Sequence, residues 1–216
     1  MESAYSNTAM PTSSNPPRLL ALCTGRVAPL MVRSGGQEPP RRVQSGIAKT
    51  VVSSVSDPVL HRLGPLGIEG DEQCDLTVHG GPQRALYAYT FAHYAFWKRL
   101  LTEHQGRVDR LENPGAMGEN LSIEGLSEDT VYLGDEWLVG DVVLRVTEPR
   151  EPCFKFNAVM GWSGAAKAMF EQGCSGWYLS VVTPGVFAAG SDIHVLDGPR
   201  RQTVRQAFLG KKSSTL

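Results

Sequence analysis

A cysteine flanked by basic residues is the strongest chemical signal in this sequence. Cys153 lies in the segment EPREPCFKFN at 148–157, with Arg150 before it and Lys155 after it. Nearby cations favour a thiolate over a thiol, and two neighbouring prolines restrict the backbone that positions the sulfur. A thiolate is either a nucleophile or a soft metal ligand. The local sequence alone does not decide between these roles and an inert structural cysteine.

The segment HGGPQRA at 79–85 has the residue types of an anion-binding turn. Gly80 and Gly81 allow backbone N–H groups to approach a ligand closely. Arg84 can hold a phosphate through two hydrogen bonds, and His79 adds a ring nitrogen. Without further context, a tight surface turn explains the same residues.

Two asparagines and an acidic loop complete the candidate groups. Asn120, in GENLS at 118–122, and Asn157 carry amides that can bond to a heterocycle, although each also fits an ordinary turn. The segment GIEGDEQ at 67–73 is expected to be a solvated loop, in which a carboxylate could orient a basic partner. All these segments lie at or beside expected strand ends, where barrel proteins commonly place their sites.

Composition indicates a globular protein with no global bias toward nucleic acid or membranes. The 216 residues are 41% hydrophobic and 20% charged, with a formal net charge of −1. This length suits one domain, and the balanced charge gives no reason to expect nucleic acid or an anionic membrane as a partner. No apolar run is long enough to span a membrane, and the N-terminus lacks the apolar core of a signal peptide. The four cysteines show no C-x-x-C spacing, so we expect a cytoplasmic protein without a disulfide framework.

Many short strands are expected to position these segments, because the chain contains 23 glycines and 14 prolines. Strands are expected from Arg18 onward, at 47–55, before and after the HGG turn, after Gly118, in a 131–149 hairpin that turns at Gly140-Asp141, and near 177–185 and 192–196. A loop is expected at 34–42. This pattern predicts a mixed β/α fold, a β-barrel with a few peripheral helices.

Two helices and two terminal tails complete the expected organisation. One helix is expected to run from a cap at Thr90 to about His104, and a second over about 162–172 with Gly173 after its end. Residues 1–17 are expected to form a disordered tail, and residues 200–216 a basic tail that frays.

Taken together, the segments resemble the MOSC domain, and in particular its bacterial YiiM-like branch. The matching stretches follow the family's order: GIEGDEQ, VHGGPQRALYAY with HYAFW, GENLS with EGL, VYLGD and PREPCFKFN, spread over about 45–185. The resemblance implies a MOSC-type β-barrel over 18–199 that binds molybdenum cofactor. In this cofactor (Mo-molybdopterin) the dithiolene of a phosphorylated pterin holds a molybdenum ion. At family level the resemblance also carries an association with pyridoxal phosphate binding.

The resemblance assigns the metal-binding and catalytic cysteine of the family to Cys153. A soft thiolate suits a thiol-rich molybdenum centre. The phosphate and the pterin also need cations and hydrogen-bonding groups. The residues expected to supply them are His79, Gly80, Arg84, Asn120, Arg150, Lys155, Asn157 and Lys49.

The YiiM-like branch implies the reduction of N-hydroxylated compounds, such as 6-hydroxylaminopurine, by oxygen-atom transfer to molybdenum, a detoxification reaction. The chain has neither an iron–sulfur cysteine pattern nor a dinucleotide-binding glycine fingerprint. We therefore expect an external electron donor, either a reductase or a ferredoxin-like protein. A homodimer remains an alternative to a monomer. Members of this branch usually continue into a small helical C-terminal domain, which we do not expect here.

Two other functions remain open from the sequence. One is a non-catalytic module that carries molybdenum cofactor or sulfur and keeps Cys153 without turnover. The other is a cysteine hydrolase with Cys153 as nucleophile and His79 as base, although no segment indicates an oxyanion hole.

Overall fold

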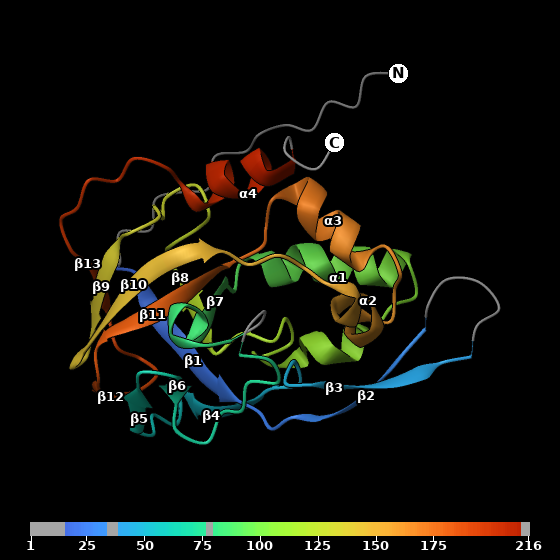
Figure 1. The fold of residues 1–216 in the computed structure, drawn as a ribbon, viewed down its shortest axis with the longest axis horizontal. Helices are drawn as coiled ribbons and strands as arrows, with labels where there is room; N and C mark the ends of the chain where they lie inside the picture. Colours follow the sequence, from blue (N-terminus) through green and yellow to red (C-terminus); the bar gives the residue numbers. More distant parts are fainter. Residues whose placement is uncertain (1–15, 34–38, 77–79, 213–216) are drawn as a thin grey trace.

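The structure, a computed structural model, describes residues 16–33, 39–76 and 80–212 (Figure 1). Its strands are β1 (Arg18–Thr24), β2 (Ala28–Val32), β3 (Arg41–Ser45), β4 (Thr50–Ser54), β5 (His61–Gly64), β6 (Gly67–Ile68), β7 (Leu86–Thr90), β8 (Leu121–Glu124), β9 (Glu136–Val139), β10 (Val142–Pro149), β11 (Trp177–Thr183), β12 (Gly185–Phe187) and β13 (Ile193–Val195). Its helices are α1 (His93–Glu103), α2 (Phe154–Met160), α3 (Ala165–Gln172) and α4 (Val204–Lys212), with short 3-10 helices at Pro82–Arg84 and Val108–Glu112.

A large curled sheet forms the body of the molecule (Figure 1). Its strand order is β13-β9-β10-β11-β7-β8-β1-β4, and β7 pairs with β8 in parallel while the other neighbours are antiparallel. Backbone bonds then join the segment before β13 to the start of β1. The Leu19 N–H donates to the Ser191 carbonyl at 3.0 Å, and the Ile193 N–H donates to the Pro17 carbonyl at 2.7 Å. These bonds close the curled sheet, so the expected β-barrel with peripheral helices is confirmed.

The barrel wall has an apolar core on each face, because strand side chains alternate between the two faces. Leu86 and Ala88 of β7 pack inside the barrel with residues such as Trp137. Tyr87 and Tyr89 point to the opposite face and pack against helical residues, among them Trp97 and Phe156. Figure 1 shows α1, α2 and α3 gathered beside the sheet. Side chains on this outer face can therefore line a site between the barrel and its helices.

Several expected elements are confirmed where a local signal defines them. The β9–β10 hairpin turns at Gly140-Asp141, and β1 and β4 lie within the expected segments. Helix α3 ends at Gln172, and the following Gly173 adopts the left-handed conformation with a φ of 67°. None of the helices in the described ranges is long and apolar enough to cross a membrane.

Other expectations about local structure are wrong. Thr90 does not cap α1: it is the last residue of β7, and its hydroxyl donates to the Leu126 carbonyl at 2.8 Å. Arg41 and Arg42, expected in a loop, belong to β3 and pair with β2. The sequence also gave no indication of α2, the helix that directly follows Cys153.

The prediction of a fraying tail after residue 200 is wrong for the residues that form α4. Val204 and Phe208 on this helix are fully buried, and the Phe208 ring lies 4.5 Å from the ring of Phe170 on α3. An apolar face at helical spacing therefore packs α4 onto the body of the molecule, despite the basic composition of the segment. The expected N-terminal tail falls almost wholly on residues 1–15, outside the described residues.

Candidate functional site

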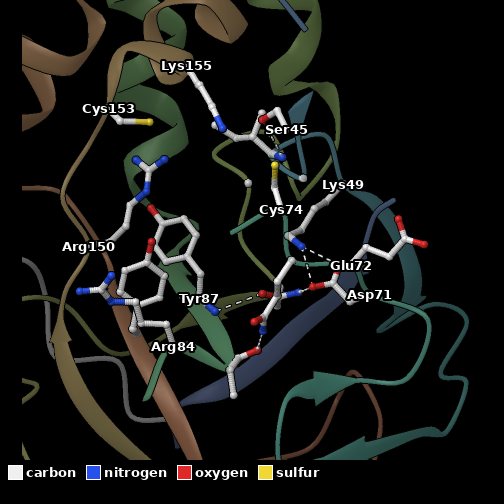
Figure 2. A pocket seen from close by; sticks show the side chains of 17 residues that line it. Ser45, Lys49, Asp71, Glu72, Cys74, Arg84, Tyr87, Arg150, Cys153 and Lys155 are labelled. Atoms are coloured by element: carbon white, nitrogen blue, oxygen red, sulfur yellow. Dashed lines mark hydrogen bonds and ion pairs between the residues drawn. The ribbon is translucent and has the colours of Figure 1, made fainter. Parts of the chain in front are cut away.

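A pocket on the outer face of the barrel brings together segments that are far apart in the sequence (Figure 2). The end of β3, the 71–74 loop, β7, β11 and the start of α2 all contribute to its lining. Six of the nine expected site residues line it: Lys49, Arg84, Asn120, Arg150, Cys153 and Lys155.

Of the other three expected residues, Asn157 and Gly80 do not line this pocket. The Asn157 Oδ1 accepts a hydrogen bond from the Ala166 N–H at 2.7 Å, which ties α2 to α3. Gly80 is buried beside the side chain of Gln73, whose Oε1 would lie 2.4 Å from a Cβ at that position. A side chain at position 80 would therefore displace the Gln73 amide, whose Oε1 accepts a hydrogen bond from the Gly81 N–H at 2.7 Å. His79 lies outside the described residues, so its role stays a prediction.

Cys153 lies directly before α2, at the point where the chain leaves β10 and turns toward the helices. Its backbone is extended, with φ −117° and ψ 174°, and the residue is half-buried. Figure 2 shows its sulfur directed toward the pocket, beside the guanidinium of Arg150. A half-buried thiol at a pocket wall is accessible to a ligand, which an inert core cysteine is not.

Arg150 is a buried cation with aromatic rather than acidic neighbours. The residue is only 6% exposed, and its guanidinium carbon lies 5.1 Å from the ring centres of both Tyr87 and Phe156. Burial opposes its charge, but the surrounding polar groups outweigh this effect and leave the pKa of Arg150 raised. No carboxylate in the described part of the chain forms an ion pair with it. Since a buried charge is costly without a counterion, this site favours an anionic ligand.

Lys155 is a second cation without an acidic partner among the described residues. Its Nζ donates to the Gln44 carbonyl at 2.8 Å, which connects α2 to β3. Arg150 and Lys155 thus lie on either side of Cys153 in the sequence. No described carboxylate forms an ion pair with either of these two positive charges.

Lys49, in contrast, is fully paired at the far wall of the pocket. Its Nζ lies 2.6 and 2.8 Å from the two carboxylate oxygens of Asp71, and the two side chains are 7% and 5% exposed. Asp71 also accepts a hydrogen bond from the Gly25 N–H at 2.8 Å. The expected solvated loop is therefore wrong at Asp71, and the alternative, a carboxylate that orients a basic partner, is confirmed.

Asn120 holds the wall of the pocket together. Its Oδ1 accepts the Tyr87 N–H at 3.1 Å, while its Nδ2 donates to the Cys23 carbonyl at 3.2 Å and to Asp71 at 2.9 Å. Both amide hydrogens are thus used inside the protein. This arrangement makes Asn120 a residue that positions β7, β1 and the Asp71 loop.

Arg84, at the end of the 3-10 helix before β7, is paired with a carboxylate on β10. Its Nε lies 2.6 Å from Glu148 Oε1, and this hydrogen bond is the main reason that the pKa of Arg84 is raised. The guanidinium also lies over the Tyr178 ring, 5.6 Å from its centre. Its charge is consequently balanced in part before any ligand binds.

Some pocket residues were not anticipated from the sequence. Tyr178 and Tyr87 line it, as do the second thiol, Cys74, and the end of the β2–β3 hairpin at Ser45. Tyr178 on β11 and Tyr87 on β7 alternate with residues that face the barrel interior. This alternation in the sequence could have placed both tyrosines on the outer face. Only the pairing of β7 with β11, which places Tyr87 opposite Tyr178, shows that they belong to one site.

Charge pairing gives the pocket its chemical character. Four basic and two acidic residues line it, and both acidic residues, Asp71 and Glu72, are already paired with a basic side chain. The excess positive charge therefore lies on the side of Cys153. Such an arrangement can bind an anion next to a thiol ligand.

Comparisons with known proteins agree with this geometry. A family model described as the MOSC domain matches residues 75–194. Protein YiiM of Escherichia coli is 40% identical over 145 residues, which cover 67% of this chain and 63% of that protein. A protein of Gibberella moniliformis named "Reductase" is 38% identical over 134 residues, 62% of this chain and 23% of that protein. The chain thus spans less than two thirds of the length of these relatives. The crystal structure of YiiM from Escherichia coli superimposes with a TM-score of 0.61 and 31% identity, over 85% of this chain and 76% of that one.

Proposed function

The chain belongs to the MOSC domain family, and we propose that its pocket binds molybdenum cofactor through Cys153 and reduces N-hydroxylated compounds. The observation that carries this proposal is the buried Arg150, which has no described carboxylate partner and lies beside Cys153 in one pocket. The name of the Gibberella relative supports an oxidoreductase.

The donor set of the pocket fits a phosphorylated, sulfur-rich cofactor. The Cys153 thiol is the soft ligand that molybdenum needs, and Arg150 and Lys155 can form charge-assisted hydrogen bonds to a phosphate. Lys49 and Asn120 hold the opposite wall through Asp71. In this assignment the residues that bind the cofactor are those around Cys153, and the opposite wall sets the shape of the cavity.

When bound, the cofactor supplies two-electron oxygen-atom transfer. The overall reaction is R–NH–OH + 2 electrons + 2 protons → R–NH₂ + H₂O. We assign the electrons to a separate reductase or ferredoxin-like protein. The chain itself binds and orients the reactants and limits the access of water. The four cysteines are free thiols, which supports a location in the reducing cytoplasm.

A turnover experiment tests the proposed reaction. Protein made in a host that synthesises molybdenum cofactor is mixed with 6-hydroxylaminopurine and a chemical reductant, and adenine is quantified. We expect multiple turnovers that depend on the molybdenum content. Fully loaded protein that forms no adenine would contradict the enzyme and favour the non-catalytic carrier. Hydrolytic activity that is independent of molybdenum but lost on thiol alkylation would favour the cysteine hydrolase.

A further inference from the structure

Tyr178, a residue with a phenol hydroxyl, lines the same pocket as Cys153. On β11 it pairs with Tyr87 of β7 on one side and with Glu148 of β10 on the other. Residues directly opposite each other on paired strands share one face of a sheet. Tyr178 therefore lies on the outer face of the barrel, between the strand of Tyr87 and the strand whose Glu148 holds Arg84.

The two tyrosines of the pocket differ in what their hydroxyl groups do. The buried Tyr87 hydroxyl donates its hydrogen to the Ser175 carbonyl at 2.8 Å. No described residue accepts a hydrogen bond from the Tyr178 hydroxyl, and Tyr178 lines the pocket. A phenol hydroxyl can donate one hydrogen bond, so the hydrogen of Tyr178 is available to an acceptor bound in the pocket. Tyr178 thus has a proton to give, whereas the Tyr87 proton is committed to the protein.

Two cations stabilise the anion that proton donation would leave on Tyr178. The Arg84 guanidinium lies over its ring at 5.6 Å, and the positive charge of Arg150, which lines the same pocket, lowers the pKa of Tyr178. Burial raises the pKa of Tyr178 above its ordinary value, and the two arginines lower it part of the way back. The hydroxyl therefore keeps its proton at neutral pH, while the cost of losing it is reduced during a reaction.

We propose that Tyr178 is the proton donor of the reaction, a role that rests on the proposed function above. As the N–O bond of R–NH–OH breaks, the substrate nitrogen takes up the Tyr178 proton and leaves as R–NH₂. The oxygen is released as water after it gains one further proton from the solvent. The external reductant supplies both electrons, and the Tyr178 phenolate regains its proton from water.

The first test compares Tyr178→Phe with Tyr132→Phe. Tyr132 is a matched control, because its ring also lies under an arginine, Arg200 at 4.5 Å, but does not line the pocket. We expect Tyr178→Phe to lower kcat by at least about 100-fold, the lower end of what positioned proton donors contribute. Its molybdenum content should equal that of the wild type. Tyr132→Phe should change neither quantity.

The pH profile separates proton donation from a structural role. In the wild type, kcat should fall as the pH rises through the pKa of Tyr178, since the phenolate has no proton to give. This alkaline decrease should be absent in the residual activity of Tyr178→Phe. A second readout does not depend on turnover: tyrosine ionisation in the full chain, followed by ultraviolet difference absorbance. The transition that is absent in Tyr178→Phe identifies the ionisation of Tyr178. Arg84→Met should move this transition to higher pH, because it removes a cation from the Tyr178 ring.

The outcomes distinguish this inference from the proposed function. If the wild type turns over and Tyr178→Phe keeps its rate and its alkaline decrease, the role of Tyr178 is overturned and the proposed function stands. A parallel loss of molybdenum in Tyr178→Phe would instead assign the residue to cofactor binding and overturn proton donation. An unchanged tyrosine titration in Arg84→Met also contradicts the assignment. A loaded wild type without turnover contradicts both proposals.

Discussion

At the scale of single residues, the basic side chains of the pocket differ in whether a carboxylate pairs with them, a difference that the sequence does not show. Lys49 is paired with Asp71, 22 positions away, and Arg84 with Glu148, 64 positions away. Neither partner follows from local sequence, because the pairing depends on how the strands are arranged. Arg150 has no described carboxylate partner. It is therefore the basic residue that the structure most clearly indicates as a binding group for an anion.

Replacing Arg150 should weaken cofactor binding without lowering the stability of the cofactor-free protein. We expect Arg150→Met to weaken cofactor retention by about 1.5–3 kcal/mol, the contribution of a hydrogen bond to a charged group. The free energy of unfolding of the cofactor-free protein should be equal or higher, because the variant no longer buries a cation without a carboxylate partner. Dialysis followed by metal analysis, together with urea denaturation, measures the two quantities.

Arg107→Met is the matched control for this experiment. Arg107 is an exposed arginine that pairs with Asp109 at 2.6 Å, away from the pocket. It should leave cofactor retention unchanged. Retention in Arg150→Met that equals the wild type would remove Arg150 from the site.

At the scale of elements, the sequence predicts those that local signals define. The β9–β10 hairpin and the end of α3 follow from turn and capping residues. Helix α2 has seven residues, too few to be stable alone, and it depends on tertiary contacts. Arg41 of β3 lies over the Phe154 ring at 5.4 Å, and Lys155 bonds to the Gln44 carbonyl. Because these contacts join distant segments, neither α2 nor the hairpin that supports it could be predicted.

Helix α4 provides a prediction at this scale. Phe208 is fully buried, whereas its neighbour Leu209 is 40% exposed. Phe208→Ala should lower the free energy of unfolding by about 3–5 kcal/mol, as expected for removal of a buried aromatic ring. Leu209→Ala is the control and should cost much less. Urea denaturation followed by circular dichroism measures both, and equal effects would show that α4 does not pack as described.

At the scale of the whole molecule, the fold keeps the candidate site outside the barrel. The interior is filled by an apolar core that includes Trp137 and Trp177, so the cavity forms between the outer wall and α2. The family resemblance anticipated the barrel and six residues of the pocket. It did not provide the strand register, which brings Tyr178 beside Arg84 and Tyr87. β7 and β11 are far apart in the sequence, so no hairpin turn fixes their register.

The molybdenum content of the purified chain tests the central claim most directly. Wild type, Cys153→Ser and Cys74→Ser are made in a host that synthesises molybdenum cofactor, and wild type also in a host that does not. Cys74 is the second thiol that lines the pocket, so its variant controls for general loss of sulfur. We predict nearly equimolar molybdenum in wild type and Cys74→Ser from the first host, and none in Cys153→Ser or in protein from the second. A folded Cys153→Ser that retains molybdenum as the wild type does would contradict the assignment of Cys153 as the metal ligand.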